Sequence, residues 1–561
     1  MQIQLPMPTN LPEDAYAYGE RTSGETHGVV LTKPHVVDLI LDLAGYTADR
    51  DLGAMTLLEP SCGTGAFLLR ALERLVASAR AHGRPLARLG GCLVGFDIDA
   101  THVAQTRLAL CGTLLARGEG DMDVAMGLAT RWVREGDFLL APLPQFDFVI
   151  GNPPYIRIEQ LAPQLQAEYR RRYTSLFDRA DLYVAFIERG LQLLREGGVL
   201  SFICADRWIL NKYGAPLREL VTSRYAVKCY VDLHDASPFE SDVIAYPSIF
   251  VLSTGKTGRV PVARLVTASE AECKAAGLAL RSLEARADAD VVVYESWFDG
   301  ADPWVLGSPA HLRVLRELES RLPTLEGDGV TRVRIGVASG ADEAYIVPSD
   351  ADIEPDRLVP LVMREDITAG QVRDAARCVI NTFGANGKLI DLVQYPRLAR
   401  HLDRFDKVRL RHVAKKNPNG WFRTIDRVYP ELASTPKLLV PDIAGSNEVT
   451  YEAGRFHPHH NLYFITSTAW DLEVLGGLLS SRVALFFVWS YAVKMRGGYL
   501  RFQAQYLRRI RVPRPGSLPA SLAEDIKAAF RERDFKRLDE LALQAYGLAE
   551  LPAFDFVDTR S

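Results

Sequence analysis

The tetrapeptide Asn152-Pro153-Pro154-Tyr155 combines groups that can bind a planar molecule carrying an amino group. It follows the apolar run Phe146 to Ile150, which predicts a strand, so the asparagine falls in the loop at the strand's carboxyl end. The two prolines stiffen this loop by fixing φ and by restricting the residues that precede them. The loop therefore offers an amide, a rigid carbonyl and an aromatic face together, a set that suits a nucleobase.

A second candidate site is the run Glu59-Pro60-Ser61-Cys62-Gly63-Thr64-Gly65, which follows a predicted strand and precedes a predicted helix. Its glycines allow a ligand to approach the backbone, and the helix start offers free N–H groups. The spacing is neither that of a dinucleotide fingerprint nor that of a Walker loop. Glu59 would repel a phosphate, so we expect a ligand with an ammonium group here.

Two further acids end the next strands of the predicted sheet. Asp97 and Ile98 follow one strand, and an acid at that place commonly accepts ribose hydroxyls. Asp137 and Phe138 follow the next, pairing an acceptor for an exocyclic amine with an aromatic face. An amino-acid end, a ribose and an adenine make up S-adenosylmethionine, which we predict as the cofactor. Taken singly, each acid could instead be a helix N-cap, and Phe138 could belong to the core.

The elements that must position these residues alternate between strand and helix over about residues 33–255. Helical spacing of apolar residues predicts helices at 34–43, 65–79, 101–117 and 180–194, and short apolar runs predict strands at 54–58, 91–96, 146–150 and 198–205. We expect a Rossmann-like, doubly wound α/β domain with a mostly parallel sheet. The irregular region beyond about 260 predicts a mixed α+β domain, with strands at 332–337, 344–347 and 437–441.

Composition is that of an ordinary globular protein, with 48% hydrophobic and 24% charged residues and a net charge of −4. Seven scattered cysteines without a CxxC indicate reduced thiols in a cytoplasmic protein, without disulfides or a zinc site. No signal peptide and no membrane span are expected.

The order of these segments resembles that of the N6-adenine DNA methyltransferases with the gamma order of motifs, the Asn-Pro-Pro-Tyr family of type II restriction-modification methylases. Gly28 to Pro34 is similar to the family's leading motif, although Lys33 separates the threonine from the proline. The resemblance implies a class I S-adenosylmethionine-dependent fold and a C-terminal target-recognition domain. It implies cofactor contacts from Val30, Thr32, Glu59, Pro60, Cys62, Gly63, Gly65, Asp97, Ile98, Asp137, Phe138 and Asn152.

In this interpretation Asn152, Pro153 and Tyr155 are catalytic. Two oxygens, from the Asn152 amide and the Pro153 carbonyl, would accept the hydrogens of a flipped-out adenine N6, while Tyr155 stacks on the base. Tyr213 matches the family's second base-stacking aromatic, with Trp208 as an alternative, and either could be core. By family habit Asn rather than Ser at 152 favours adenine over cytosine.

Basic residues in the C-terminal half predict contacts with double-stranded DNA. Residues 404–427 hold eight basic and two acidic residues within a chain of negative net charge, and a second basic group surrounds 497–499. The candidates are Arg409, Arg411, Lys415, Lys416, Trp421, Arg423, Lys494, Arg496 and Arg501. A solvated charged face is the alternative. The run His457-Pro458-His459-His460 has no evident Cys or carboxylate partner, so we expect a polar loop and no metal.

We therefore predict three parts: a catalytic domain at 1–258, a target-recognition domain with its connecting segment at 259–515, and a helical tail at 516–561. The predicted protein is a monomeric DNA methyltransferase, with a separately encoded restriction endonuclease as a possible partner on the same DNA site. Three alternatives remain open: an RNA methyltransferase, a protein-glutamine methyltransferase, and a catalytically silent DNA-binding subunit.

Overall fold

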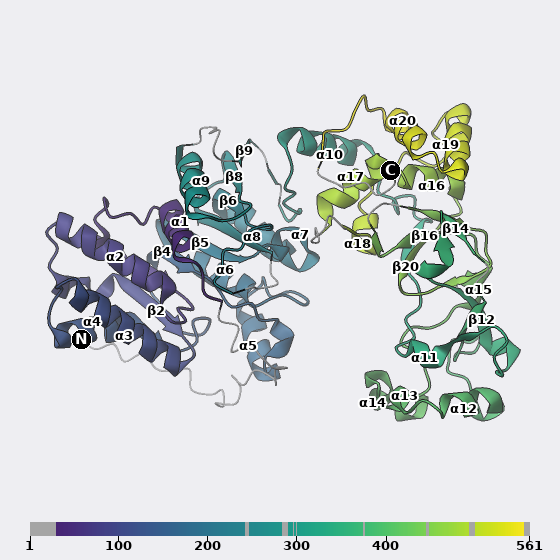
Figure 1. Ribbon diagram of the computed structural model, residues 1–561, viewed down its shortest axis with the longest axis horizontal. Helices are drawn as coiled ribbons and strands as arrows, with labels where there is room; N and C mark the ends of the chain where they lie inside the picture. Colours follow the sequence, from purple (N-terminus) through teal and green to yellow (C-terminus); the bar gives the residue numbers. More distant parts are fainter. Residues whose placement is uncertain are drawn as a thin grey trace. The chain divides into compact units, whose positions relative to one another are not determined.

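The computed structural model describes residues 30–241, 246–282, 290–295, 297–298, 300–373, 376–444, 448–492 and 500–554. The chain divides into two compact units, Met1–Val305 and Leu306–Ser561. Figure 1 shows an α/β first unit and a second unit of smaller sheets and helices.

A single sheet of nine strands forms the centre of the first unit, in the order β3-β2-β1-β4-β5-β7-β6-β8-β9. The neighbours from β3 to β5 are parallel, whereas β7 runs antiparallel to both β5 and β6. The strands are β1 Leu57–Glu59, β2 Leu93–Asp97, β3 Val133–Glu135, β4 Phe146–Gly151, β5 Leu194–Ala205, β6 Tyr225–Asp232, β7 Pro247–Thr254, β8 Val260–Arg264 and β9 Asp290–Tyr294. This topology confirms the expected Rossmann-like class.

Helices cover both faces of this sheet, as alternate residues of β5 show. Ser201 donates a hydrogen bond to the carbonyl of Ile40 in α1, while its neighbours Leu200 and Phe202 face Gly190 in α6. The helices are α1 Pro34–Ala44, α2 Ala66–Ala81, α3 Ala100–Ala116, α4 Met122–Trp132, α5 Pro163–Arg172, α6 Tyr183–Gln192, α7 Arg207–Leu210, α8 Ala215–Arg224 and α9 Glu270–Ser282.

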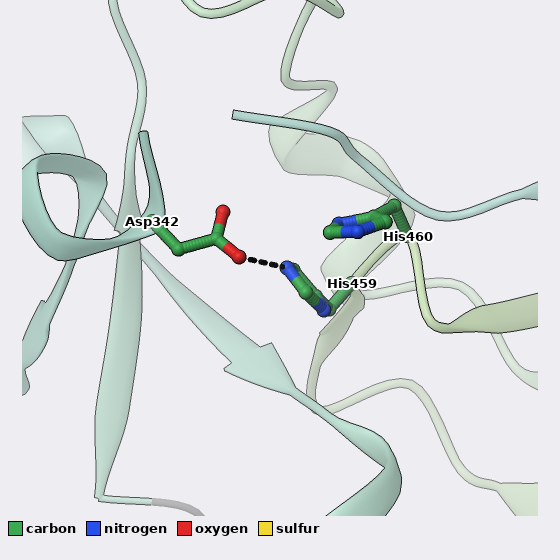
Figure 2. A group of neighbouring side chains, drawn as sticks. All are labelled: Asp342, His459 and His460. Atoms are coloured by element: carbon green, nitrogen blue, oxygen red, sulfur yellow. Dashed lines mark hydrogen bonds and ion pairs between the residues drawn. The ribbon is translucent and has the colours of Figure 1, made fainter. Parts of the chain in front are cut away.

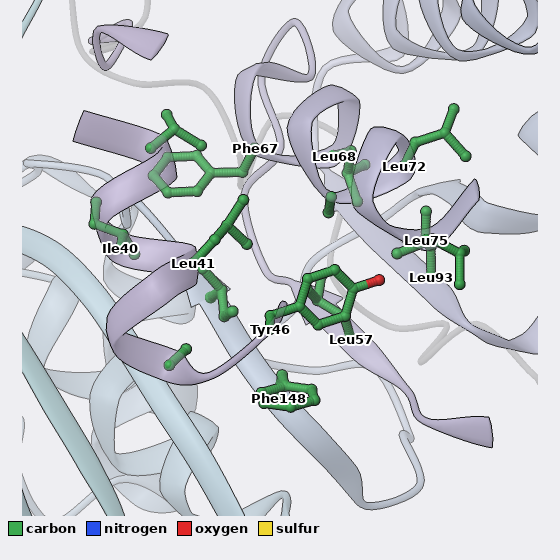
Figure 3. Close-up of a cluster of buried hydrophobic side chains, with 14 of the residues drawn as sticks. Ile40, Leu41, Tyr46, Leu57, Phe67, Leu68, Leu72, Leu75, Leu93 and Phe148 are labelled. Carbon is green, nitrogen blue, oxygen red and sulfur yellow. The ribbon is translucent and has the colours of Figure 1, made fainter. Parts of the chain in front are cut away.

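The largest part of the core lies between the sheet and α1 and α2. Figure 3 shows Leu41 and Phe67 from these helices with Leu57 and Phe148 from the strands beneath them, all of them buried. Tyr46 meets Phe148 edge-on, with ring centroids 5.3 Å apart. This packing fixes the strand ends from which the candidate site residues project.

The second unit contains two four-stranded sheets and a group of helices. The first sheet has β10 Arg332–Ile335, β20 Leu462–Thr466, β16 Lys437–Pro441 and β18 Thr450–Glu452, and the second has β11 Ile346–Pro348, β15 Arg377–Ile380, β12 Leu358–Val362 and β19 His457–Pro458. Two-stranded ribbons pair β13 Ile367–Thr368 with β14 Gln371–Val372, and β17 Ile443–Ala444 with β21 Leu500–Arg501.

The helices of this unit gather at its two ends (Figure 1). One group consists of α12 Pro396–Leu402, α13 Asp406–Leu410 and α14 His412–Lys416. The other includes α10 Pro309–Arg321, α16 Leu472–Leu479, α17 Arg482–Tyr491, α19 Ala520–Glu532 and α20 Phe535–Tyr546. The short helices α11 Asp342–Tyr345, α15 Pro430–Ala433 and α18 Ala504–Leu507 lie in the connections.

The predicted helical tail is present as α19 and α20, which pack on α16 and α17 within the second unit. Two other expectations differ from the observed fold. The sheet of the first unit does not end at residue 258, because β8 and β9 add two more strands to it and the unit extends to Val305. The stretch 344–347 is also wrong as a strand: its first half ends α11, and only Ile346 and Val347 enter β11.

Among the described residues, no single helix is long and apolar enough to span a membrane. The pair α16 and α17 passes this test only when joined, although the two helices meet at a bend of 60°. Nearly all of their apolar side chains are buried inside the second unit.

Candidate active site

A cleft opens at the carboxyl ends of β1, β2, β3 and β4, the edge at which open α/β sheets bind ligands. All of the predicted cofactor residues except Gly65 contribute to its lining. Around the cleft lie Val30, Thr32, Glu59, Pro60, Cys62, Gly63, Asp97, Ile98, Asp137, Phe138, Asn152, Pro153 and Tyr155.

The glycine-rich loop between β1 and α2 is held against the end of β2 by backbone groups. The Cys62 N–H donates to the Phe96 carbonyl at 2.7 Å, and the Gly63 N–H donates to Oδ2 of Asp97 at 2.8 Å. Gly65 has φ +92°, and a Cβ there would lie 2.9 Å from Cγ2 of Thr106. Gly65 therefore faces Thr106 of α3 and not the cleft, so it shapes the loop without lining the cleft.

Glu59 ends β1 with its side chain buried at the floor of the cleft. One carboxylate oxygen accepts the N–H of Leu68 at 3.1 Å, near the start of α2. Burial raises the pKa of Glu59 well above its usual value, against the lowering effect of this hydrogen bond. A cationic ligand group beside Glu59 would favour the ionised carboxylate, so the site suits an ammonium better than an anion.

Asp97 is the last residue of β2, and Asp137 follows the end of β3. Asp97 accepts the N–H groups of Gly63 and Asp99 at 2.8 and 2.9 Å, which fixes its carboxylate in the cleft. Asp137 accepts the Tyr169 hydroxyl at 2.6 Å and the Leu139 N–H at 2.8 Å. Burial raises the pKa of Asp137, an effect that the Tyr169 hydroxyl opposes.

Apolar walls separate these carboxylates. Ile98 leaves 43% of its surface exposed at the cleft, an unusual exposure for isoleucine in a folded domain. Phe138 is almost fully buried and packs against Phe186 with centroids 5.1 Å apart. Ile98 and Phe138 both line the cleft, and apolar contacts of this kind suit a purine ring.

Asn152 has the most informative geometry of the site. Its Nδ2 donates to the Val30 carbonyl at 3.1 Å and to Oγ1 of Thr32 at 3.4 Å. Because the Val30 carbonyl can only accept, the amide orientation is set, and Oδ1 must face the other way. Oδ1 is buried and has no hydrogen-bond partner among the residues that the structure describes. The Asn152 side chain thus has one fixed hydrogen-bond acceptor, Oδ1, that a donor on a ligand can satisfy.

Tyr155 lines the same cleft as Asn152. Its ring meets Phe239 edge-on at 6.3 Å and lies 6.5 Å from Tyr183. Burial raises the pKa of its hydroxyl well above the usual range, so the phenol stays protonated at neutral pH. Pro153 and Pro154, which precede it, also line the cleft.

The predicted second aromatic occupies a different environment from Tyr155. Tyr213 does not line the cleft; its hydroxyl shares a hydrogen bond with Tyr183 at 2.8 Å and donates to Oδ2 of Asp181 at 3.2 Å. Trp208 is fully buried between Phe250 and Trp304, so the alternative aromatic belongs to the core.

The basic candidates of the second unit separate into two kinds. Arg411 donates to the carbonyls of Val408, Ser339, Trp421 and Arg423 and to the Tyr345 hydroxyl, so it ties loops together. Arg423 and Arg501 also have internal partners, backbone carbonyls and Asp442 respectively. Lys415 and Lys416 are exposed on α14. Lys494 and Arg496 lie outside the described residues.

Arg409 stacks on the half-buried ring of Trp421. The guanidinium carbon of Arg409 lies 3.5 Å from the Trp421 ring centroid, and the side chain also pairs with Asp403 at 2.9 Å. Half of the Arg409 side chain remains exposed. A stacked arginine of this kind is available to an anionic partner.

Sequence reasoning missed several residues of the cleft, among them Tyr169, Leu182 and Phe186. Tyr169 lies on α5, a helix that was not predicted, and Phe186 lies on the cleft side of α6. The helical periodicity of 180–194 indicated that α6 exists. It carried no information on which side of the helix would close over the strand ends.

The histidine run 457–460 was expected to bind no metal because no carboxylate or cysteine partner was evident, and the structure contradicts this reason. A carboxylate does lie nearby, because Nε2 of His459 is 3.1 Å from Oδ2 of Asp342, which is 117 residues away in the chain. Burial and the neighbouring His460 lower the pKa of His459.

Comparisons with known proteins agree with this geometry. Residues 91–239 match the Eco57I restriction-modification methylase family. The chain is 46% identical to the type II methyltransferase M.PaeR7I of Pseudomonas aeruginosa, over 94% of this chain and 92% of that protein. It is 43% identical to M.XhoI of Xanthomonas vasicola, over 94% and 98% of the two chains.

Among solved structures, the fold is similar to that of the type IIL restriction-modification enzyme MmeI in complex with DNA. The TM-score is 0.62 at 13% sequence identity, covering 93% of this chain and 75% of MmeI. With relatives above 40% identity along nearly its whole length, the chain belongs to the type II methyltransferases of restriction-modification systems.

Proposed function

We propose that the chain transfers a methyl group from S-adenosylmethionine to N6 of an adenine extruded from duplex DNA. The observation that supports this most is the buried, unpartnered Oδ1 of Asn152. A buried acceptor without a partner costs about 1–3 kcal/mol. A substrate amino group that donates to it would remove this cost.

The residues of the cleft fit the cofactor. Glu59 would hold the ammonium of the methionine part, Asp97 the ribose hydroxyls, and Asp137 the adenine amine, with Ile98 and Phe138 against the ring. When bound, the cofactor supplies an activated methyl group on a sulfonium, so the protein needs no covalent intermediate. Each Asp137 oxygen already accepts one hydrogen bond, from the Leu139 N–H and from the Tyr169 hydroxyl, and these two bonds orient the carboxylate for a further donor.

The chain's own residues would then prepare the nucleophile. The lone pair of an adenine N6 is delocalised into the ring, and it becomes more available when the nitrogen turns tetrahedral. Hydrogen bonds from the amino group to Oδ1 of Asn152 and to the Pro153 carbonyl favour that geometry and stabilise the positive charge that develops. Tyr155 would hold the base in place by contact with its face.

Adenine is preferred over cytosine on the evidence of Asn152 and of the relatives. The chain is 24% identical over 69% of its length to PglX of Streptomyces coelicolor, which is named an adenine-specific methyltransferase. An asparagine at this position is also the family's habit in adenine-specific enzymes.

Duplex DNA is the proposed polymer, bound chiefly by the second unit. Lys415, Lys416 and the Arg409–Trp421 stack offer exposed positive charge on α13 and α14 and the loop after them. The MmeI structure contains DNA, and the relative RM.Eco57I of Escherichia coli is named both a restriction enzyme and a methyltransferase. We extend the proposal to a separate endonuclease that cuts the same sequence and to an enzyme that acts as a monomer.

One experiment tests the proposal. Tritiated S-adenosylmethionine is incubated with the protein and plasmid DNA, ribosomal RNA or total cell protein, and the labelled product is digested to nucleosides or amino acids. We expect label in DNA as N6-methyladenine. Label in N4-methylcytosine would refute the base, label only in RNA or protein would refute the polymer, and no label would favour a silent DNA-binding subunit.

A further inference from the structure

Three potential metal ligands meet in the second unit, and none of them belongs to the cleft lining. Asp342 begins α11, and His459 and His460 follow β19 (Figure 2). One ligand atom from each residue lies within 4.8 Å of the other two. The backbone joins the same two segments, since Val337 bridges His459 in a parallel pair.

The spacing of the first two ligands is close to that of a coordination shell. In a tetrahedral zinc site with bonds near 2.0–2.1 Å, neighbouring ligand atoms lie about 3.3–3.4 Å apart. The Asp342 to His459 distance is 3.1 Å. His460 is exposed, so rotation of its side chain can bring a ring nitrogen closer without disturbing the core.

His459 is held in the position that a metal ligand would need. Its side chain is only 3% exposed, and its Nε2 lies 3.1 Å from Oδ2 of Asp342. An ion that replaces the proton between these two atoms would bind both the imidazole lone pair and the carboxylate, and the imidazole proton would then be on Nδ1.

We propose that Asp342, His459 and His460 bind one divalent transition-metal ion of the zinc class. Two imidazoles and one carboxylate are borderline ligands, which favour Zn²⁺, Co²⁺ or Ni²⁺ over Mg²⁺. Water would complete the shell on the exposed side of His460. Ser339 donates a hydrogen bond to the other Asp342 oxygen and would orient the carboxylate as an outer-shell partner.

The ion would join the loop between β10 and α11 to the segment between β19 and β20. Both connections belong to the unit proposed above to bind DNA, but the site itself does not depend on that proposal. Its expected effect is to stabilise this unit in the manner of any ligand that binds only the folded state.

Metal binding can be measured directly on the full chain without a histidine tag. The protein is stripped with a chelator, dialysed, and titrated with ZnCl₂ or MgCl₂ by calorimetry, and bound zinc is counted by plasma mass spectrometry. We expect one zinc per chain, no comparable binding of Mg²⁺, and a higher unfolding temperature with zinc.

The variants are His460→Ala, Asp342→Asn and the control His412→Ala, an exposed histidine on α14 of the same unit. Loss of a ligand is expected to weaken zinc binding by at least about tenfold. His412→Ala is expected to bind as the wild type does. Absence of zinc binding in the wild type, or equal affinity in all four proteins, would overturn the proposal. Methylation is not the readout, so either result leaves the proposed function untouched.

Discussion

Replacing Asn152 by alanine removes a side-chain amide whose orientation is set by two hydrogen bonds. Its Nδ2 donates to the Val30 carbonyl and to Thr32, its Oδ1 has no hydrogen-bond partner among the described residues, and Asn152 lines the cleft. The substitution thus deletes the proposed acceptor for the target amine. It also deletes two hydrogen bonds that join the loop after β4 to the segment before α1.

The expected loss in kcat follows from these contacts. Removing one preorganised dipole at a reacting centre typically costs about 10²–10³-fold in rate, or about 3–4 kcal/mol. The Pro153 carbonyl remains, so residual activity above background is expected. The two lost hydrogen bonds should cost about 1–3 kcal/mol of folding stability in total, since each contributes about 0.5–1.5 kcal/mol. DNA affinity should change little.

The assay is single-turnover methyl transfer to duplex DNA at saturating cofactor, with DNA affinity measured in parallel. Asn152→Asp is the informative companion: it keeps the shape but replaces the donor to Val30 by an oxygen that repels that carbonyl. Glu159→Ala, at an exposed residue seven positions along the chain, serves as control and should remain active. A near wild-type rate for Asn152→Ala would refute the mechanism.

Three further predictions follow from single contacts. Glu59→Gln should weaken S-adenosylmethionine binding, measured by calorimetry, by about tenfold. Because burial raises the pKa of Glu59, the affinity of the wild type for the cofactor should rise with pH as the carboxyl ionises. The variant should lack this rise in affinity with pH. Tyr155→Phe should keep activity within a few fold in the same transfer assay, because the Tyr155 hydroxyl has no partner among the described residues, whereas Tyr155→Ala should lose base stacking worth about 1–3 kcal/mol. Lys437→Met should lower the unfolding free energy in urea by about 3–5 kcal/mol, since Lys437 and Glu452 form a fully buried ion pair at 2.5 Å. The double variant Lys437→Met with Glu452→Leu should recover only part of this loss, because leucine removes the unpaired carboxylate but also the acceptor of the Gly454 and Arg455 N–H groups. Equal losses in the single and double variants would contradict this prediction.

The candidate site was largely predictable because strand ends are local features of the sequence. A short apolar run followed by an acid is visible without any tertiary information, and parallel strands bring such ends to one edge. Glu59, Asp97, Asp137 and Asn152 meet for that reason. Tyr169 was not predictable, because it comes from α5, whose charged sequence PQLQAEYRRR has little apolar periodicity and whose position depends on packing.

The extent of the first unit was less predictable than its centre. The strands β8 and β9 are short, and they lie beyond the GKTGR turn that suggested an end to the sheet. β8 pairs with β6, and β9 pairs with β8. Burial favours these long-range pairings, because Val260, Val262 and Ala263 are almost fully buried in β8. The edge strand of a sheet can pair with any further strand that is available. Local sequence patterns therefore do not predict how many strands the sheet contains.

Charge is the property that sequence reasoning handled least well, because a count of basic residues says nothing of their partners. Arg411 and Lys415 stand four positions apart in the same basic run. The Arg411 guanidinium donates hydrogen bonds to four backbone carbonyls, whereas Lys415 is exposed on α14. The two should respond differently to alanine substitution: Arg411→Ala should lower the unfolding temperature, while the pair Lys415→Ala and Lys416→Ala should leave it unchanged and flatten the salt dependence of DNA binding by up to about two counterions. A salt slope equal to that of the wild type would place the DNA elsewhere on the second unit.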